Sequence, residues 1–388
     1  MLSDPARYWA DVRVGGDVQW SDAHRGWLVL SHAEAGAAFR DGQHLSADRT
    51  GALARAAAAQ PEAFARTVEL LSGWMIFRDP PVHTRLRDPV RVAFTPRRMA
   101  QLTHYVKGVV DELLDPALQA GRLDARPELA GPLPGLVIAE LLGVPRSQRD
   151  EFTSWSDALA EIVFSVRPRT VDPAPVTEAT DHFIAFFSDL IDHYRRQPAD
   201  NLLTALVQGT GDLSEIELVG ACTLLLFAGH ETTTNLLTTA IGHLVEEPAD
   251  RCRLRDDPGL GERAVDELLR TMGPAATMVR KVAVDHERGG RQLRQRDTVF
   301  ISIAAANHDP GVFVDPGRID LGRDPNPHLG FGWGLHHCLG AALARLESRI
   351  ALTTLVQRSP DLRPGATVSL LHGDVMGRAR PVVEVLLR

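Results

Sequence analysis

The sequence predicts a mainly α fold with small β-sheets. Four stretches repeat apolar residues every three or four positions, as amphipathic helices do: 102–118, 128–142, 177–195 and 262–272. Three short stretches have the β-branched and aromatic residues typical of strands: 27–30, 298–303 and 382–387. No internal repeat is evident, and the Pro-containing stretch 167–176 is interpreted as a long surface loop rather than a domain boundary. We therefore expect a single domain over residues 1–388.

The composition is that of a globular protein of a reducing compartment. The 388 residues are 44% hydrophobic and 24% charged, which suffices for a sizeable core. A net charge of −8 without a Lys/Arg-rich run argues against a nucleic-acid partner. The three cysteines suggest no disulfide framework, and the N-terminus lacks the order of a signal peptide. The longest apolar stretch, 218–229, is too short to span a bilayer, so we expect a cytoplasmic protein without a membrane partner.

One long helix can be placed by the signals at its ends. Ser214 and Glu217 have the S-x-x-E spacing of a capping box, an apolar run follows, and Pro248 marks the far end. At 1.5 Å per residue, the stretch 215–247 would be roughly 50 Å long. A helix of this length must cross the core of the domain.

The middle of this helix combines weak helix formers with an acid. Residues 228–235 read AGHETTTN, and because Gly and Thr are poor helix formers we expect a local bulge there. Glu231 adjoins the long apolar run, and a buried carboxylate is costly unless it has a partner or a purpose. Glu231 is therefore a candidate functional residue.

The stretch FGWGLHHCLG, 331–340, places a single cysteine at the start of a helix. The helix is predicted because apolar residues recur at helical spacing after Cys338, at Leu339, Leu343, Leu346 and Ile350. The N–H groups at a helix start favour a thiolate, which is a soft metal ligand. Gly332, Gly334 and Gly340 would let the backbone approach a flat ring closely. One thiolate with the opposite axial position open is the ligation of an oxygen-cleaving iron porphyrin.

Zinc is the rival interpretation of this stretch. His328, His336, His337 and Cys338 are close in sequence, but they have neither the C-x-x-C nor the H-x-x-x-H spacing of a tetrahedral site. His230 and Glu231 begin an H-E-x-x-H motif that Thr234 interrupts. Zinc would also leave the glycine spacing unexplained.

With these motifs in hand, the sequence resembles the cytochrome P-450 family, in its bacterial, soluble class. The pattern F-G-x-G-x-H-x-C-x-G is complete, and Glu267 and Arg270 upstream form the family's E-x-x-R. The pattern residues are Phe331, Gly332, Gly334, His336, Cys338 and Gly340. The resemblance implies a helix-rich triangular domain, with heme b (iron protoporphyrin IX) between the long central I helix and the L helix that follows the Cys338 ligand. It also implies that Glu267 and Arg270 form a buried structural ion pair.

The resemblance further implies which residues contact the heme. Cations are expected to face the two propionates, and Ala228 is expected to lie over the porphyrin face. The propionate partners by this correspondence are His83, Arg87, Arg280, His328 and His336. Three positions depart from the family pattern: His308 replaces an Arg, Arg296 replaces a Gly before the strand, and His337 replaces an apolar residue beside the ligand.

By the same resemblance, Glu231 and Thr232 are the acid and alcohol that deliver protons for dioxygen activation. The chemistry requires this independently, since O–O cleavage needs protons in a site that otherwise excludes water. Family members that use peroxide directly carry Arg and Pro at these positions. We therefore expect a monooxygenase that uses O2.

Electrons are expected from a separate protein. Only about fifty residues follow Cys338, which leaves no room for a fused reductase. The resemblance favours a ferredoxin-type donor over a flavodoxin, with NAD(P)H as the ultimate source. Arg345 and Arg349 are candidates for its docking face.

The substrate is expected to be a medium or large hydrophobic molecule of specialised metabolism. The stretches that match the family's substrate contacts are rich in apolar residues. The candidate contacts are Trp74, Met75, Phe227, Ala228, Met278, Val279 and Val375. Polyketide, terpenoid, alkaloid and fatty-acid substrates stay open, as do hydroxylation, epoxidation, dealkylation and oxidative coupling or cyclisation. A non-catalytic heme-binding sensor is the alternative of a different class, and the acid and alcohol pair speaks against it.

Overall fold

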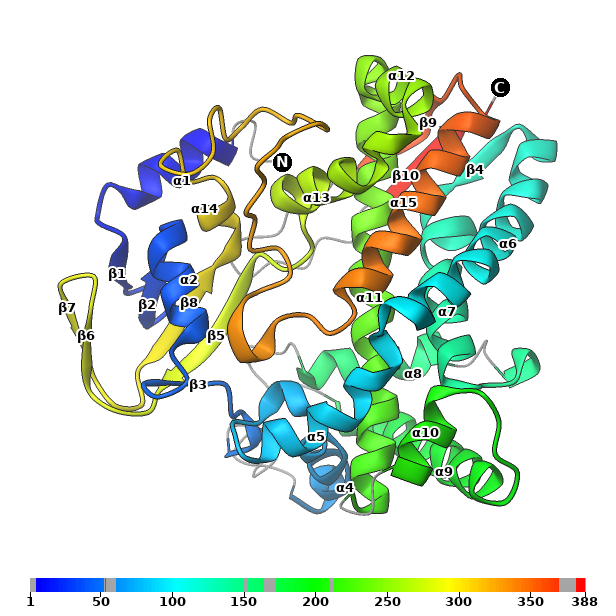
Figure 1. Ribbon diagram of the computed structural model, residues 1–388. Helices are drawn as coiled ribbons and strands as arrows, with labels where there is room; N and C mark the ends of the chain where they lie inside the picture. Colours follow the sequence, from blue (N-terminus) through cyan, green and yellow to red (C-terminus); the bar gives the residue numbers. More distant parts are fainter. Residues whose placement is uncertain are drawn as a thin grey trace. The chain divides into compact units, whose positions relative to one another are not determined.

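The computed structural model describes residues 5–51, 53, 61–148, 152–163, 172–209, 213–369 and 382–387. The fold is mainly α-helical with three small sheets, as the sequence predicts (Figure 1). The helices are α1 (Pro5–Arg13), α2 (His32–Arg40), α4 (Pro61–Ser72), α5 (Val82–Arg91), α6 (Pro96–Ala120), α7 (Pro132–Leu142), α8 (Phe152–Val163), α9 (Pro173–Arg196), α10 (Leu202–Gly209), α11 (Glu215–Glu246), α12 (Pro248–Asp256), α13 (Gly261–Met272), α14 (Ile303–Asn307) and α15 (Ala341–Arg358). Short helical turns include η1 (Met75–Phe77), η3 (Arg126–Ala130) and η7 (Gly334–His336).

The chain divides into two compact units. The larger unit comprises Met1–Ser46, Met99–Pro134 and Glu231–Arg388. The smaller unit comprises Ala47–Arg98 and Gly135–His230. The boundary between Pro134 and Gly135 falls inside α7, and the boundary between His230 and Glu231 falls inside α11.

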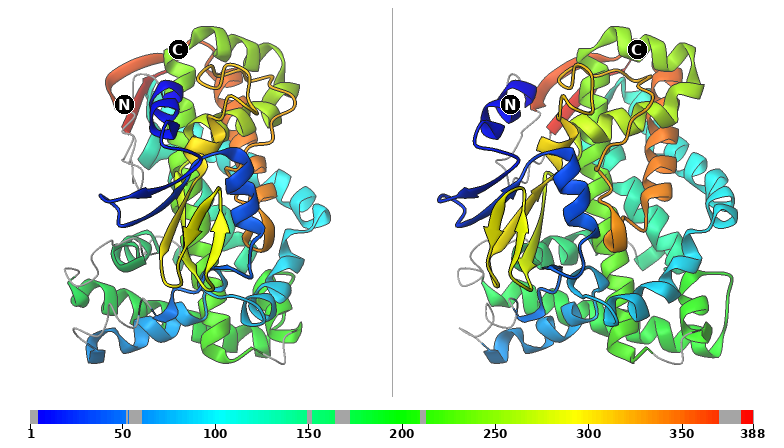
Figure 2. Two further views of the ribbon diagram at one scale, coloured as in Figure 1. Left: turned by 90° about the vertical axis from the view of Figure 1, so that its left-hand side faces the viewer. Right: turned by 60° about the vertical axis from the view of Figure 1, so that its left-hand side comes forward.

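All described strands belong to the larger unit. A five-stranded sheet has the order β1-β2-β8-β5-β3, in which β2 and β8 pair in parallel and the other neighbours are antiparallel. A three-stranded sheet has the order β4-β10-β9, and β6 and β7 form a separate hairpin, seen in yellow in Figure 2. The strands are β1 (Val18–Ser21), β2 (Gly26–Val29), β3 (Leu45–Ser46), β4 (Arg122–Asp124), β5 (Thr277–Val282), β6 (His286–Arg288), β7 (Arg291–Leu293), β8 (Thr298–Ser302), β9 (Arg363–Ser369) and β10 (Val382–Leu386).

The core of the larger unit lies between the five-stranded sheet and the helices packed on it. Residues of β2 and β8 pack with α2 and α14, so that helix α2 covers part of one face of the sheet. One buried cluster contains Val29, Phe39, Val299 and Ile301. The cluster anchors the strand β5, whose outer residues are candidate site residues.

The described part of the smaller unit is built from helices. Aromatic side chains fill the contact between α8 and α9, where Phe152 stacks parallel to Phe183 at 6.4 Å between ring centroids. The first half of α11 packs closely on the turn after α4, because a Cβ at Gly220 would lie 3.1 Å from the Cα of Gly73. Close backbone approach of this kind needs glycine on at least one side.

Helix α11 begins as predicted and continues without the expected bulge. The N–H of Ser214 donates to Glu217 Oε2 at 2.9 Å, and the N–H of Glu217 donates to Ser214 Oγ at 3.4 Å, so the capping box is present. The bulge predicted for residues 228–235 is wrong, since α11 is continuous from Glu215 to Glu246. Threonine hydroxyls in this helix, such as Thr238 donating to the carbonyl of Thr234 at 2.8 Å, add to the helical bonds rather than replacing them.

Other boundaries also differ from the sequence predictions. The helix predicted over 128–142 is interrupted: the turn η3 closes with the N–H of Gly131 bonded to the carbonyl of Arg126 at 2.8 Å, and α7 starts afresh at Pro132. The loop predicted over 167–176 is wrong for its last residues, because α9 begins there. Asp172 caps this helix and Pro173 lies in its first turn, where the backbone N–H that proline lacks would have no partner within the helix. Residues 167–171 lie outside the described residues. The three predicted strands are confirmed within one residue as β2, β8 and β10.

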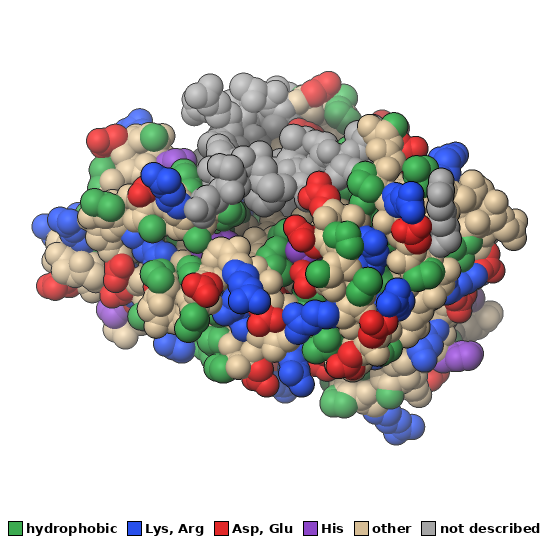
Figure 3. All heavy atoms as spheres, turned by 90° about the horizontal axis from the view of Figure 1, so that it is seen from above, with side chains coloured by type: hydrophobic (Ala, Val, Ile, Leu, Met, Phe, Trp, Pro, Cys, Tyr) green, Lys and Arg blue, Asp and Glu red, His purple; other side chains and the backbone are tan. Residues whose placement is uncertain are grey.

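Three further observations concern membrane crossing, disulfides and surface charge. Within the described ranges, no helix combines the length and apolar composition that a bilayer crossing requires. The three cysteines form no disulfide. On the face shown in Figure 3, basic and acidic side chains are interspersed rather than gathered by sign.

Candidate active site

Cys338 lies in a turn that two glycines shape. Gly332 and Gly334 have φ of 66° and 72°, a left-handed conformation that glycine adopts without steric cost. A Cβ at Gly334 would lie 2.5 Å from the carbonyl oxygen of Phe39 in α2, so a larger residue does not fit. The N–H of Cys338 donates to the carbonyl of Phe331 at 2.9 Å and closes the turn.

The side chain of Cys338 is exposed immediately before α15. The helix starts at Ala341 with Gly340 as its N-cap, so the sulfur lies near the positive end of the helix dipole. In contrast, Cys222 in α11 is buried, and burial raises the pKa of its thiol to about 12. Cysteines without disulfides are usually buried, which makes the exposure of Cys338 unusual.

The backbone beside Cys338 leaves space for a flat ligand. A Cβ added at Gly340 would meet no atom within 4 Å, while φ of Gly340 is an ordinary −83°. The backbone conformation therefore does not require glycine at this position, and the missing side chain leaves open space beside Cys338. An exposed cysteine at a helix start, with open approach on its C-terminal side, fits the axial ligand of a heme iron.

A polar cluster ties this turn to α13. Asp266 accepts hydrogen bonds from Nε2 of His328 at 3.3 Å and from Nε of Arg345 at 2.7 Å. The Arg345 guanidinium also lies over the ring of Phe331, 4.5 Å from its centroid. Burial alone would raise the pKa of Asp266, but the bonds from His328 and Arg345 hold it below its usual value. The N–H of Gly330 donates to Nδ1 of His328, so a propionate bond to His328 would have to replace one of these two contacts.

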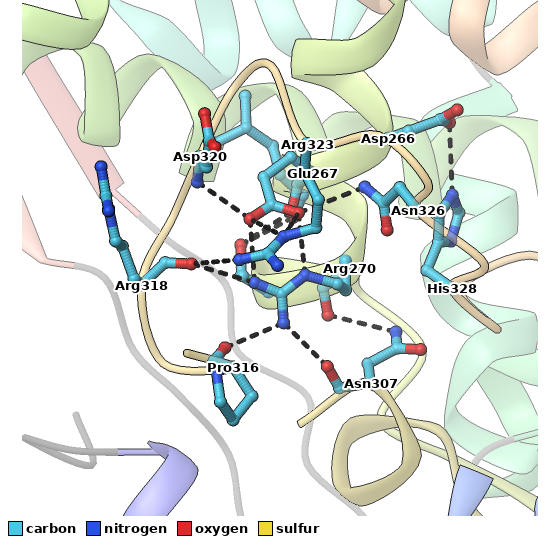
Figure 4. A network of polar contacts seen from close by, with 12 residues as sticks. Asp266, Glu267, Arg270, Asn307, Pro316, Arg318, Asp320, Arg323, Asn326 and His328 are labelled. Carbon is cyan, nitrogen blue, oxygen red and sulfur yellow. Dashed lines mark hydrogen bonds and ion pairs between the residues drawn. The ribbon is translucent and has the colours of Figure 1, made fainter. Parts of the chain in front are cut away.

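Glu267 and Arg270 on α13 form the buried ion pair that their spacing predicts (Figure 4). Both Glu267 oxygens accept from Arg270, at 2.8 and 2.9 Å, and Arg323 donates Nε to both at 3.1 Å. Burial alone would raise the pKa of Glu267, but the bonds from Arg270, the N–H of Asp320 and Arg323 hold it below its usual value. The remaining Arg270 donors bond to backbone carbonyls of Asn307, Pro316 and Arg318. The sequence analysis missed the second arginine, which lies 56 residues from Glu267.

The other predicted propionate partners occur in both units. In the smaller unit, His83 and Arg87 are four residues apart on α5, and burial together with the charge of Arg87 lowers the pKa of His83. In the larger unit, Arg280 on β5 places its guanidinium 5.9 Å from the ring centroid of Phe39. His336 is half-buried in η7. Their role toward a propionate stays a prediction.

Glu231 and Thr232 are neighbours on α11 with different surroundings. The residue Thr232 is exposed, whereas the Glu231 side chain is 17% exposed and bound by Arg126. Nη2 of Arg126 donates to the two Glu231 oxygens at 3.2 and 3.4 Å, and Nη1 donates to Oδ1 of Asn235 at 2.7 Å. Nδ2 of Asn235 donates to Oε1 of Glu231 at 3.3 Å. No motif links η3 to α11, so the contacts of Arg126 with Glu231 and Asn235 could not be predicted from the sequence.

The predicted substrate contacts of the smaller unit are mostly buried. Trp74 and Phe227 have ring centroids 4.9 Å apart, and Trp74 stacks on Phe77. Trp74, Met75 and Phe227 are 0%, 3% and 5% exposed, whereas Ala228 is exposed. Of these four candidates, only Ala228 offers an exposed surface to a ligand.

The predicted substrate contacts of the larger unit are divided by the alternation of a strand. Val279 packs against the buried cluster around Trp9 and Phe300. Met278, the preceding residue of β5, is 37% exposed, because successive side chains of a strand point to opposite faces. Val375 lies outside the described residues.

Two departures from the family pattern differ in how the structure accommodates them. His308 is 3% exposed at the end of α14, and burial lowers its pKa to about 4, so the ring is neutral. Arg13 donates to the carbonyl of His308 at 2.8 Å and pairs with Asp309 at 2.9 Å, which supplies the cationic contact from α1. Arg296 has φ of 75°, the left-handed conformation that a glycine would adopt at no cost.

The third departure adjoins the cysteine. The N–H of His337 donates to the carbonyl of Gly334 at 3.1 Å, which completes the turn η7. Its ring centroid is 6.4 Å from those of Phe331 and Trp333, and it is perpendicular to the latter. The side chain is therefore held in an aromatic group beside Cys338.

Comparisons with known proteins agree with this arrangement. The family model described as "Cytochrome P450" matches residues 260–359, which include the E-x-x-R pair and the cysteine turn. The crystal structure of P450BioI in complex with an acyl carrier protein ligated to hexadec-9Z-enoic acid has a TM-score of 0.89 and 30% identity, and covers 99% of this chain and 98% of that one.

Curated relatives extend the match over the whole length. Mycinamicin IV hydroxylase/epoxidase of Micromonospora griseorubida is 40% identical over 303 residues, 76% of this chain and 75% of the relative. The cytochrome P-450 monooxygenase PikC of Streptomyces venezuelae is 38% identical over 396 residues, 99% of this chain and 90% of the relative. With the exposed Cys338 of its glycine turn and relatives of this identity and coverage, the chain belongs to the cytochrome P-450 family of heme-thiolate monooxygenases.

Proposed function

We propose that this protein inserts one oxygen atom from O2 into a medium or large hydrophobic molecule, in specialised metabolism. The proposal rests above all on the exposed Cys338 before α15, the single soft ligand that a heme iron needs. The relative named mycinamicin IV hydroxylase/epoxidase supports the class of chemistry. The absence of disulfides among the three cysteines supports a reducing compartment, the cytoplasm.

The residues present can hold the cofactor and orient it. Cys338 would ligate the iron, and the side chains of His83, Arg87, Arg280 and His336 would bind the propionates. When bound, the heme supplies the reductive activation of O2, which no side chain can perform. Gly340 would let the ring approach the backbone, since nothing lies within 4 Å of a Cβ at that position.

The chain's own part in the reaction is proton delivery and exclusion of water. Thr232 is exposed on α11, where its hydroxyl can accept and pass on a proton. Glu231, the preceding residue, is only 17% exposed on its side chain and would supply that proton from the solvent side. Buried apolar residues such as Trp74 and Phe227 would keep other water away.

Electrons would come from a ferredoxin-type partner and ultimately from NAD(P)H. Arg345 and Arg349 on α15 are half-buried and follow Cys338 within one helix. Arg345 is already bound to Asp266, so Arg349 is the better candidate for contact with an acidic partner. Charge complementarity of this kind mainly raises the rate of association.

The thiolate ligand can be tested by spectroscopy. Replacing Cys338 by Ser should remove the red-displaced absorption of the ferrous carbonyl complex that cysteinate ligation produces, because the soft ligand is lost. Replacing the half-buried Cys252 by Ser is the matched control and should leave the spectrum unchanged. A normal spectrum in the Cys338→Ser protein would refute the heme-thiolate assignment.

Proton delivery can be tested by measuring how NADH-derived electrons divide between product and peroxide. With a ferredoxin, its reductase and a substrate found by a spin-state screen, Thr232→Ala should divert NADH-derived electrons into peroxide. Product per NADH should fall by about 100-fold, the low end of a general acid–base contribution. Thr239→Ala, which removes a hydroxyl bonded to the carbonyl of Asn235, is the control within the same helix. Unchanged coupling in Thr232→Ala would remove the assigned role of the hydroxyl.

A further inference from the structure

Arg126 makes contacts with Glu231 and Asn235 that the sequence does not predict. Arg126 is the first residue of the π-helical turn η3, which follows β4 and precedes α7. Its two terminal nitrogens are used separately: Nη1 bonds to Asn235 at 2.7 Å, and Nη2 bonds to Glu231 at 3.2 and 3.4 Å. Glu231 and Asn235 are four residues apart, so both lie on one face of α11.

Among Arg126, Asn235 and Glu231, the bond from Arg126 to Asn235 is shorter than the bonds to Glu231. The bond from Arg126 to Asn235 is short, whereas those from Arg126 and Asn235 to Glu231 are 3.2 to 3.4 Å, at the long end of the hydrogen-bond range. Breaking the contacts to Glu231 leaves the guanidinium bonded to Asn235. The carboxylate can therefore leave Arg126 while the arginine keeps its place.

The exposure of the pair agrees with a role in proton transfer. The side chains of Arg126 and Glu231 are 21% and 17% exposed, so water reaches the pair and a released carboxylate is not left unsolvated. The pair of Glu267 and Arg270 on α13 is different, with both side chains 0% exposed and bonds of 2.8 and 2.9 Å. A purely structural ion pair in this chain therefore has closer and drier contacts.

We infer that Arg126, anchored by Asn235, is a positioning residue that holds the Glu231 carboxylate and sets its orientation for proton transfer toward Thr232. This inference rests on the proposed function of Glu231. Arg126 touches neither substrate nor cofactor in this role and acts only through Glu231. Carboxylate orientation matters because a proton passes efficiently only over hydrogen-bond distance.

The main test compares Arg126→Gln with wild type in the heme-loaded protein. We expect an unchanged ferrous carbonyl spectrum, but product per NADH lower by about 3- to 10-fold and a changed solvent isotope effect on turnover. A crystal structure of the variant should show the Glu231 carboxylate in another rotamer. Arg126→Lys should recover only part of the coupling, because one ammonium cannot reproduce the fork that serves two residues.

Matched variants separate this inference from a general effect of lost charge. Arg122→Gln removes an arginine four residues earlier, whose ion pair with Glu128 spans 4.0 Å at 56% and 40% exposure, and should leave coupling and isotope effect at wild-type values. If Arg126 acts through Glu231, Arg126→Gln should add nothing in a Glu231→Gln background. Additive losses in the double variant would overturn the inference.

The remaining outcomes distinguish the two levels of the proposal. If Glu231→Gln lowers coupling but Arg126→Gln leaves coupling, isotope effect and the Glu231 rotamer unchanged, the positioning role is wrong and the proposed function stands. If Glu231→Gln itself leaves coupling unchanged, the role of Glu231 fails and the role of Arg126 fails with it. Faster turnover with intact coupling in Arg126→Gln would also contradict the inference, because the arginine would then only restrain the carboxylate.

Discussion

Three buried ionisable residues show how strongly the surroundings decide the charge of a side chain. Glu267 keeps its charge because two arginines bond to it. His308 is neutral because burial lowers its pKa to about 4. Glu347 on α15 is 2% exposed, and burial raises its pKa to about 8. The same burial therefore favours different protonation states, depending on whether a counter-charge is present.

The raised pKa of Glu347 predicts a pH dependence of stability. The folded state keeps the proton up to pH about 8, whereas the unfolded chain releases it near the ordinary glutamate pKa of 4.5. The free energy of unfolding should therefore fall as pH rises from about 4.5 to about 8 and should change no further above that range. Glu347→Gln should remove this dependence and stabilise the protein by about 4 kcal/mol at pH 8, as measured by denaturant unfolding at several pH values.

A control tests whether Glu347 is the source of that dependence. Glu246→Gln, at the exposed C-terminal residue of α11, should leave the pH profile of the wild type unchanged. Parallel profiles for wild type and Glu347→Gln would show that the carboxyl ionises at the same pH in the folded and unfolded states. The protonated state of Glu347 would then be excluded.

At the scale of an element, the start of α11 combines a capping box that the sequence predicts with a contact from another helix that it does not. The capping box of Ser214 and Glu217 is predicted by spacing and is present. The structure adds Arg85 of α5, whose two terminal nitrogens bond to the two Glu217 oxygens. These bonds from Arg85, the largest effect, lower the pKa of Glu217 to about 2. One side chain thus both caps α11 and joins it to α5.

This double role predicts acid-dependent stability. Because the pKa of Glu217 is lower in the folded state, its contribution is complete above pH about 4.5 and is lost as pH falls toward 2. At pH 7, Glu217→Gln should lower the free energy of unfolding by about 1–2 kcal/mol, a moderate value because the Arg85 side chain is 39% exposed. Near pH 2.5 the difference from wild type should nearly vanish.

The neighbouring acid provides the comparison for this measurement. Glu215→Gln alters the same first turn of α11, but Glu215 is 53% exposed and contacts Arg195 at 3.4 Å. Its effect should be within about 0.5 kcal/mol at pH 7, as for exposed ion pairs generally. Equal losses for the two variants would show that charge at the helix start matters and that Arg85 does not.

At the scale of the whole molecule, Arg270 connects parts of the chain that no local signal relates. Its donors reach Glu267 on the same helix, the carbonyl of Asn307 after β8, and the carbonyls of Pro316 and Arg318 (Figure 4). Every one of these groups lies in the larger unit. These polar contacts therefore help to hold the long segment between α14 and the cysteine turn on α13.

Removing Arg270 should destabilise the protein strongly. Arg270→Ala leaves three carbonyls and part of a buried carboxylate without a donor, which should cost about 3–5 kcal/mol. Arg270→Lys should recover little, since one ammonium cannot reach carbonyls on several sides. The checks are the denaturant midpoint and the fraction of purified protein that gives the ferrous carbonyl band.

An exposed arginine in the same region serves as the reference for Arg270. Arg253→Ala breaks the pair with Asp320, whose side chains are 48% and 39% exposed, and should change stability by less than about 1 kcal/mol. A small effect of Arg270→Ala, comparable to that of Arg253→Ala, would contradict the structural role of the buried network.

Local chemistry alone determined much of this protein. Periodicity predicts α6, α9 and α13, the capping box predicts the start of α11, and glycine spacing predicts the turn at Cys338. These features depend on residues within one or two helical turns of each other, so they are legible in the chain order. The same holds for the ion pair of Glu267 and Arg270, which are three residues apart.

Only the tertiary structure decided the contacts between distant segments. Arg126 meets Glu231 across 105 residues, and Arg323 meets Glu267 across 56. The tertiary structure also decided that Val279 is packed inward and Met278 is exposed, because packing against Trp9 and Phe300 determines which face of β5 is buried. The physical reason is that hydrogen bonds and burial act over a few ångströms in space, and chain order specifies that distance only for near neighbours.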